Sequence, residues 1–590
     1  MVKYKKCSSD IHYIDTFLTL ALFCIFLTFD QANKTILNFT NFKIILHMKT
    51  LLLILSAILF FLQTGKACTI IVAGKKATVD GSVLNSHTDA GADCRIRVVA
   101  GQKFPKGSMA PVYYGIQRVD LPLDDNGEIL GYIPQVEQTY TYFQSAYSHI
   151  NEYQLCIGES TTSQRPELQV NKGEGKQIMT VEQAMIFALQ RCKTAEEALT
   201  LITSLMEKYG FLPSCGPESE CLTIADPEGV WVLELFSVGK NWTPESGKPG
   251  VIWAAQRVPD DEIAMIPNWS IIKEIDLSKP EQFRASSNYQ QVAIENGWYS
   301  PASGKPFVWQ DVYAPTPREW ATNRFWLFVN TFAPSLDPIP SRRTNNPFDN
   351  LNQYIQYVEP LSVYPFSFKP EQKVSVKDFM DFQRSTFSGT IYDKENDAVW
   401  YYPDKNGNMV KSKLATPFPS SETQKLMKTT RRRLVARVDG EYGMVAQLRS
   451  DLPREIGGIY WVFQDNAYTS PYLPIFTGVT RIPEVYSTYN PKEYSDNSAR
   501  WAIDFVDNLL YLNWQDGKKD LEAARAPMEQ SFFERNAEIE KEFIALQKKN
   551  PKKATELLNK YTQECADTIM QTYVQLRNTL ITKYTNNKMR

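Results

Sequence analysis

The chain has 590 residues, 43% hydrophobic and 22% charged, and its 64 Lys and Arg residues nearly balance its 66 Asp and Glu residues. This composition excludes a disordered or collagen-like chain, and the length suffices for several domains or one large enzyme core with additions. A formal net charge of −2 lacks the basic excess that binding to a phosphate backbone requires. We therefore predict no nucleic-acid partner, and we expect the short arginine run 431–433 to be a solvated face.

A signal-peptide pattern begins at Met48. A lysine and the almost wholly apolar run 51–62 follow it, and small residues precede Cys68. The run is shorter than the ~20 residues that a membrane-spanning helix needs. We predict that the segment 48–67 is a cleaved signal peptide. The protein would then be exported, periplasmic or secreted, without stable membrane insertion after processing; an uncleaved anchor is the alternative.

Residues 1–47 do not belong to a signal that starts at Met48. The simplest interpretation is an upstream mis-start or an extra leader. The alternative is a membrane anchor formed by the apolar run 17–29, which would leave Cys68 inside the chain.

Seven of the nine cysteines lie after the predicted cleavage point. An odd number in an exported chain leaves one thiol unpaired or paired between chains. Cys215 and Cys221 could close a small loop, but the sequence does not assign the connectivity.

Cleavage would make Cys68 the first residue and place an α-amine and a thiol on one residue. The amine has a reference pKa of ~7.7 to 8.0, so part of it is an unprotonated base near neutral pH. It can take the thiol proton, and the thiolate can attack an amide carbonyl to form a thioester. We predict no cofactor and no metal, because this chemistry needs neither and no cysteine pair has zinc-finger spacing.

A lipid-modified cysteine is the alternative reading of Cys68. A lipoprotein signal has leucine or a similar apolar residue three positions before the cysteine, where this chain has Gly65. We therefore favour the nucleophile.

A β-hairpin is predicted directly after Cys68. The run 69–73 is rich in β-branched residues, and 82–88 returns after an Asp-Gly turn. The return brings His87 and Asp89 beside Cys68, where a carboxylate could orient the terminal amine. The alternative for Asp89 is a turn-capping role.

Several short motifs along the mature chain occur in an order typical of one family. They are the segments 68–72, 80–82, 86–89, 131–136, 151–155, 158–161, 255–261, 445–449 and 478–483. Each is weak alone, but together they resemble the cysteine dipeptidases of the N-terminal-nucleophile superfamily. That family is related to dipeptidase A, and its relatives include bile salt hydrolases and penicillin V acylases.

The resemblance implies an α+β fold with a four-layer αββα core, in which two stacked antiparallel sheets lie between helical layers. It also implies that Cys68 is nucleophile and base and that Asp89 holds the amine. By the same resemblance Asn151 would donate to the oxyanion hole, and Asn268 would be a second polar site residue. Without the family, each asparagine would be read as a turn amide.

One position departs from the acylase relatives, which have an arginine three residues before the aspartate. This chain has Ser86 there. We expect the role of that arginine to be absent or filled by His87 or Arg324. His87 and His149, the two histidines after the cleavage point, are otherwise expected to be structural, because the mechanism does not need imidazole.

We predict a hydrolase core at 68–495 and a helical C-terminal region at 496–590. Within the core, 229–235 has the pattern of a strand and 181–209 that of a helix. The segment 301–370 is rich in Pro, Asn and aromatic residues and predicts long loops, which either form a lid or pack over the core.

The sequence thus predicts an exported cysteine dipeptidase that hydrolyses dipeptides or short peptides through a thioester on Cys68. Its pocket must hold a free α-ammonium, for which Glu152 and Glu159 are candidates. One alternative is an amidase on non-peptide N-acyl amides, of the bile salt hydrolase or acylase type. The alternative from another class is a lipid-anchored surface protein with an acylated Cys68. The expected partners are small peptide substrates, and a homo-oligomer remains open.

Overall fold

The computed structural model describes most of the chain after the predicted signal peptide. The described ranges are 68–91, 93–115, 118–315, 319–336, 364–390, 392–429 and 433–585. They lie in one compact unit that spans Lys66–Arg590. The predicted signal peptide and residues 1–47 lie outside the described residues. No helix in the described ranges has both the length and the apolar character needed to cross a bilayer.

A six-stranded antiparallel sheet contains the strands on either side of the predicted hairpin turn. In spatial order it consists of β12 (Ile263–Ile266), β1 (Ile70–Ala73), β2 (Val83–Asp89), β16 (Tyr442–Leu448), β17 (Ile459–Gln464) and β18 (Leu473–Phe476). Every residue of β1 and β2 is buried, because both faces of the sheet are covered.

A second antiparallel sheet of eight strands packs on the first. Its order is β13 (Phe283–Ala285), β11 (Ile252–Val258), β10 (Gly229–Phe236), β9 (Ser219–Asp226), β8 (Cys156–Thr162), β7 (Ile150–Asn151), β6 (Tyr142–Gln144) and β3 (Arg97–Val99). The strand predicted at 229–235 is confirmed as β10. Strand β2 contacts β8, β9 and β10, so the two sheets are stacked.

The faces of the eight-stranded sheet alternate as the two-residue period of a strand requires. Val230 and Val232 belong to the large hydrophobic cluster that includes β1 and β12. Trp231 and Leu233 belong to a second cluster with helices α3 (Val181–Arg191) and α4 (Ala195–Tyr209).

The helical stretch predicted over 181–209 is confirmed, and it consists of two helices. Helix α3 ends at Arg191, and Thr194 starts α4 with a capping box in which Glu197 returns the hydrogen bond. Such a box satisfies backbone donors that an uninterrupted helix would not expose.

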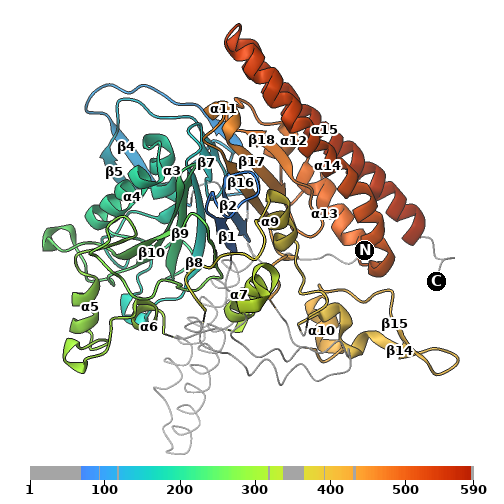
Figure 1. Ribbon diagram of the computed structural model, residues 1–590, viewed down its shortest axis with the longest axis horizontal. Helices are drawn as coiled ribbons and strands as arrows, with labels where there is room; N and C mark the ends of the chain where they lie inside the picture. The colour runs from blue at the N-terminus through green and yellow to red at the C-terminus, as the bar shows by residue number, and fades with distance from the viewer. Residues whose placement is uncertain are drawn as a thin grey trace, which may run out of the picture. The chain divides into compact units, whose positions relative to one another are not determined.

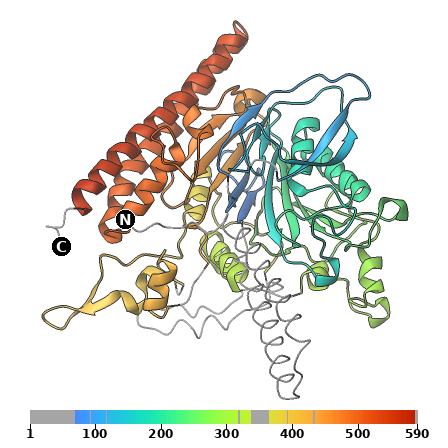
Figure 2. The ribbon, with the colours of Figure 1, turned by 180° about the vertical axis from the view of Figure 1, so that it is seen from behind.

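Helices also cover the six-stranded sheet (Figures 1 and 2). Helix α7 (Glu319–Phe332) contacts β12, and α9 (Val376–Gln383) contacts β2 and β16. Helix α13 (Ala499–Leu510) contacts β17, and α15 (Pro551–Tyr584) contacts β18. These contacts give an order of helices, sheet, sheet and helices.

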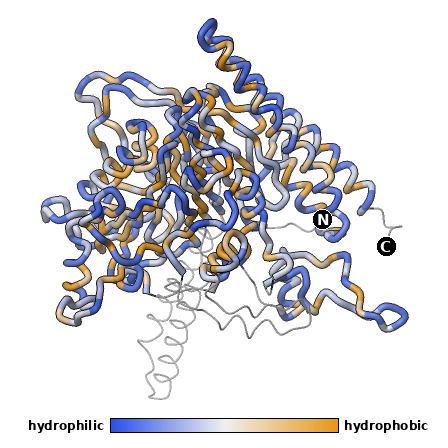
Figure 3. Tube along the Cα trace, in the orientation of Figure 1, coloured by the Kyte–Doolittle hydropathy of each residue, from blue (hydrophilic) through white to orange (hydrophobic). Residues whose placement is uncertain are grey.

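The predicted C-terminal helical region is confirmed as α13, α14 (Trp514–Gln547) and α15. Figure 3 shows mixed hydropathy along the hairpin of α14 and α15. Ile569 and Tyr573 of α15 are fully buried and belong to the same cluster as β18. The helices therefore extend the core.

Long loops were predicted for 301–370, and this is wrong for the described part. Helices α6 (Trp309–Tyr313) and α7 lie there, with buried aromatic side chains that pack into the core. Residues 337–363 lie outside the described residues.

The remaining elements are peripheral hairpins and short helices. The hairpins are β4 (Met109–Tyr114) with β5 (Glu128–Pro134) and β14 (Tyr401–Pro403) with β15 (Met409–Lys411). The short helices are α5 (Tyr289–Glu295), α10 (Ser421–Leu426), α11 (Arg454–Gly457) and α12 (Glu484–Ser487). Short 3₁₀ turns lie at Pro166–Leu168, Pro244–Ser246, Pro301–Ser303, Pro334–Leu336, Lys394–Asn396 and Ala398–Trp400.

Candidate active site

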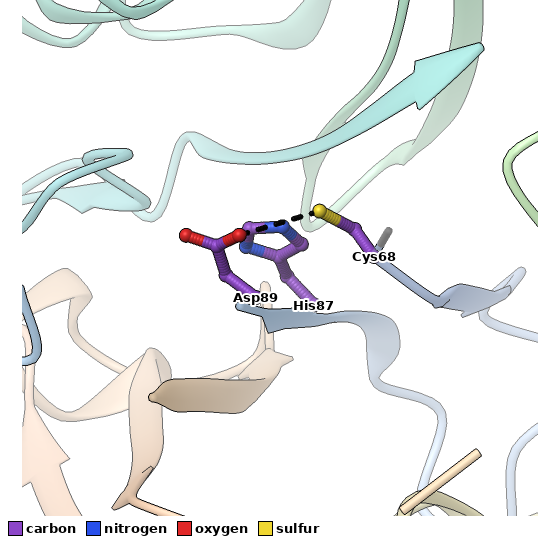
Figure 4. A group of neighbouring side chains, drawn as sticks. All are labelled: Cys68, His87 and Asp89. Atoms are coloured by element: carbon purple, nitrogen blue, oxygen red, sulfur yellow. Dashed lines mark hydrogen bonds between the residues drawn. The ribbon is translucent and has the colours of Figure 1, made fainter. Parts of the chain in front are cut away.

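The pairing of β1 with β2 places Asp89 opposite Cys68. Val72 pairs with Asn85 and Thr69 bridges to Thr88, so the same register brings Asp89 level with Cys68. The Cys68 Sγ lies 3.4 Å from Asp89 Oδ1 (Figure 4). The predicted return of the hairpin is confirmed.

A second carboxylate reaches the thiol from the other sheet. Glu159 of β8 places its Oε2 atom 3.5 Å from Cys68 Sγ. The same oxygen lies 3.7 Å from His87 Nε2. Cys68, His87 and Glu159 are all buried, so these contacts operate at low dielectric, where electrostatic interactions are strong.

The surroundings favour the protonated form of the thiol. Burial raises the pKa of Cys68 well above its usual value, and the negative charges of Glu159 and Asp89 raise it further. A general base beside the sulfur is therefore needed to form the thiolate at neutral pH.

Glu159 shares its environment with a further buried carboxyl group, Glu220 of β9. Burial would raise the pKa of Glu159, but the interactions with His87 and Glu220 outweigh it, so that this pKa is lowered. The pKa of Glu220 is raised well above its usual value by burial and by the charge of Glu159. Glu159 is therefore the more acidic member of the pair.

Arg324 of α7 fixes the backbone at Cys68. Its Nη1 donates to the Cys68 carbonyl oxygen at 2.9 Å and to Thr69 Oγ1 at 2.6 Å. Its Nη2 donates to the Pro267 carbonyl at 2.5 Å and to Asn268 Oδ1 at 3.0 Å. Burial lowers the pKa of Arg324 to about 9, and the charge of Arg437 adds to this.

Arg433 is a site residue that sequence reasoning missed. We expected a solvated face for 431–433, and this is wrong for Arg433, whose positive charge lowers the pKa of the Cys68 thiol. The pKa of Arg433 is lowered by its burial, then by the charge of Arg324. Arg431 and Arg432 lie outside the described residues. The arginine run was the only sequence signal for this residue.

Ser86 occupies the position where the acylase relatives have an arginine, and here it joins the two strands. Its hydroxyl accepts from the Ile71 amide at 3.0 Å and donates to the Ile71 carbonyl at 2.9 Å. The cations of this site come instead from Arg324 and Arg433.

Asn268 holds β8 to Arg324. Its Nδ2 donates to Ser160 Oγ at 3.0 Å and to the Thr161 carbonyl at 2.8 Å. Its backbone has a φ of 60°, a left-handed conformation that asparagine tolerates better than most residues. Asn268 is thus linked to Cys68 through Arg324.

Asn151 organises a turn and the end of a helix. Its Nδ2 donates to the carbonyls of Leu189 and Cys192 at 2.8 and 2.9 Å. Its Oδ1 accepts from the amides of Tyr153 and Leu155 at 2.9 and 3.1 Å. Both amide hydrogens are used, so these contacts do not support the predicted oxyanion role.

The two histidines form a buried chain behind the thiol. His87 Nδ1 lies 2.7 Å from His149 Nε2, and His149 Nδ1 lies 2.9 Å from the Tyr460 hydroxyl. Burial, and then His87, lower the pKa of His149 well below its usual value, so this ring is neutral. His87 faces the site and His149 supports it.

Of the two acids considered for an α-ammonium, Glu159 lies at the thiol. Glu152 instead accepts from the Thr141 amide at 2.9 Å and pairs with Arg454 at 3.3 Å. The seven described cysteines are all free thiols. The loop between Cys215 and Cys221 is therefore not closed by a disulfide.

Comparison with known proteins identifies the family. Residues 67–526 match "Peptidase family C69". "Probable dipeptidase B" of Streptococcus pyogenes serotype M1 is 23% identical over 529 residues, covering 86% of this chain and 90% of that protein. "Dipeptidase A" of Lactobacillus helveticus is 22% identical over 463 residues, covering 76% and 82%. The chain belongs to peptidase family C69, and the resemblance found in its motifs is confirmed. It is therefore an amide-bond hydrolase.

Asn151→Ala separates a structural role from an oxyanion role. Because it removes hydrogen-bond partners from two buried carbonyls, one buried amide and one half-buried amide, we expect a loss of roughly 2 to 4 kcal/mol in the free energy of unfolding. The kcat of the folded fraction should stay within about threefold. A loss in kcat of roughly 100-fold or more at unchanged stability, measured by urea unfolding and steady-state kinetics, would contradict the structural role.

Removing either carboxylate should make the thiol more acidic. Glu159→Gln should speed alkylation of Cys68 by iodoacetamide about tenfold at neutral pH, equivalent to a fall of about one in its pKa. Asp89→Asn should do so less, because its charge raises the pKa less. Peptide mass analysis across pH would measure both, with Glu152→Gln as the matched control. An unchanged or higher pKa in Glu159→Gln refutes the assigned cause.

Proposed function

We propose that this protein is an exported dipeptidase whose nucleophile is Cys68, exposed as the first residue when residues 1–67 are removed. One observation carries the proposal. The buried thiol at the start of the family-matching region lies within 3.5 Å of two carboxylates, Asp89 and Glu159. We further propose that the stacked sheets form an N-terminal-nucleophile core.

Asp89 suits the task of holding the new amine. A free α-amine on Cys68 would be bonded to the same residue whose thiol contacts Asp89. A carboxylate there orients an ammonium and keeps the amine in place when it is neutral. Because the pKa of the thiol is raised, the thiol needs a base to lose its proton, and the neutral amine supplies that base.

The reaction proceeds in two acyl-transfer steps. The amine takes the proton from Sγ, and the sulfur attacks the carbonyl carbon of the first residue of the dipeptide. The C–N bond breaks as the amine returns the proton to the leaving nitrogen, which releases the second residue and leaves a thioester. Water then attacks the thioester, with the amine as base, and releases the first residue.

Glu159 gives the site a preference for a free amino end. The α-nitrogen of a dipeptide is two bonds, about 2.5 Å, from its scissile carbon. An anion 3.5 Å from the attacking sulfur is therefore within reach of that ammonium. A substrate with a blocked amine would leave this buried charge without a partner, which strongly disfavours binding.

The Glu159 carboxylate and the burial of Cys68 weigh against the two alternatives, an acylase and a lipid-anchored protein. An acylase pocket would set the ionised Glu159 against an apolar acyl chain, at a large desolvation cost. A lipid-anchored protein would need Cys68 at the surface, whereas its side chain is 2% exposed.

Matched substrates test the proposal. Dipeptides with free amino ends should be turned over, and the same dipeptides with acetylated amines should show kcat/KM at least about 100-fold lower. Cys68→Ala should abolish turnover and leave the circular dichroism spectrum unchanged, whereas Cys68→Ser should weaken it severely. Equal turnover of acetylated dipeptides would refute the substrate assignment, and an active Cys68→Ala variant would refute the nucleophile.

A further inference from the structure

The residues around the thiol also form a set of metal ligands. One ligand atom each from Cys68, His87 and Asp89 lies within 4.8 Å of the others (Figure 4). Glu159 lies outside that group of three, but its Oε2 is 3.5 Å from the sulfur and 3.7 Å from His87 Nε2, which makes it the candidate for a fourth ligand. Sulfur, imidazole nitrogen and carboxylate oxygen are the donors that Zn²⁺ takes in proteins.

We propose that Zn²⁺ binds Cys68, His87, Asp89 and Glu159 and reversibly blocks the nucleophile. No metal site was predicted from the sequence, because the four ligands are spread over three separate segments. Of the four, only His87 and Asp89 lie on the same strand. The inhibition, though not the binding, rests on the proposed function.

Three of the donor spacings match the edges of a tetrahedral zinc site. With Zn–S of about 2.3 Å and Zn–N or Zn–O of about 2.0 Å, the tetrahedron edges are about 3.5 Å from sulfur and about 3.3 Å between the other ligands. Sulfur lies 3.4 Å from Asp89 Oδ1 and 3.5 Å from Glu159 Oε2. His87 Nε2 lies 3.7 Å from Glu159 Oε2. The ligand atoms of Cys68, His87 and Asp89 lie within 4.8 Å of one another, so side-chain movement is needed to close the remaining edges.

His87 is set up as a ligand. Its Nε2 atom is buried and has no hydrogen-bond partner, and it faces Glu159. Its Nδ1 atom contacts neutral His149, which in turn contacts Tyr460. Metal-ligating histidines characteristically use the second nitrogen in this way, which fixes the ring and its tautomer.

Charge also favours a dication. The thiolate and two carboxylates would place three negative charges around the ion in a buried site, and binding would release the thiol proton to solvent. Arg324 and Arg433 oppose this with their positive charges, but Arg324 donates its hydrogen bonds to the Cys68 and Pro267 carbonyls and to the Thr69 and Asn268 side chains.

Four protein ligands make the bound state inhibitory. A catalytic zinc site keeps an open position for water, whereas a closed tetrahedron does not. The sulfur lone pair that would attack the substrate is used by the metal. Zinc therefore competes with the dipeptide for the same thiol and for the same Glu159 carboxylate.

Direct metal binding tests the proposal without reference to activity. The purified processed protein, stripped with a chelator and kept reduced, is titrated with Zn²⁺ against a chromophoric chelator. We expect one ion per chain, at least about 100-fold weaker binding in Cys68→Ala and at least about tenfold weaker in Glu159→Gln. Cys215→Ser, which removes a thiol that contacts Tyr147, is the matched control and should bind normally.

Cobalt gives a second readout that does not depend on a variant folding. Co²⁺ bound to wild type should show a thiolate charge-transfer band that disappears when Cys68 is alkylated. Zinc should also stop dipeptide hydrolysis, and a chelator should restore it. The proposal would be overturned by any of three results: no stoichiometric zinc binding, zinc binding that is unchanged in Cys68→Ala, or a cobalt band that survives alkylation of Cys68. Zinc binding without any dipeptidase activity would instead refute only the proposed function.

Discussion

The antiparallel pairing of β1 with β2 determines where the Cys68 thiol lies relative to every charged group of the site. The register that joins Val72 to Asn85 also brings Asp89 level with Cys68. A slip of one residue would turn Asp89 to the opposite face of the sheet. Complete burial of both strands specifies the register, because a slip would exchange the side chains on the two packed faces.

Because its carboxylates are buried, the site favours the binding of cations. Asp89, Glu159 and Glu220 are all buried, and a carboxyl group that is ionised there is stable only with partners. Arg324 and Arg433 supply part of the compensation, and His87 another part. The amine on Cys68 and the substrate ammonium of the proposed function, and the proposed metal ion, would each be such a partner. Strongly perturbed groups gathered in this way are typical of functional sites.

Local sequence patterns predicted the parts of the fold that depend on local interactions. The hairpin after Cys68 was predictable because β-branched runs flank a turn, and it led directly to Asp89. The strand β10 and the C-terminal helices also followed from their periodicity. Family motifs then predicted Asn268 near the nucleophile, where it contacts Arg324.

Features that depend on tertiary contacts were not predictable in this way. The capping box at Thr194 divides a continuous helical pattern, and aromatic packing makes α7 a helix in a stretch that reads as loop. Asn151 lies within a family motif, yet its side-chain amide donates to the Leu189 carbonyl near the end of α3. Arg433 reads as surface charge because only the folded chain brings it to Cys68.

The central claim is that one residue supplies both the attacking sulfur and the base. Intact mass and amino-terminal sequencing of purified, active enzyme test it most directly. We expect every active chain to begin with an unmodified Cys68. Full activity in a chain that keeps any residue ahead of Cys68, or that carries diacylglycerol on the sulfur, would contradict it.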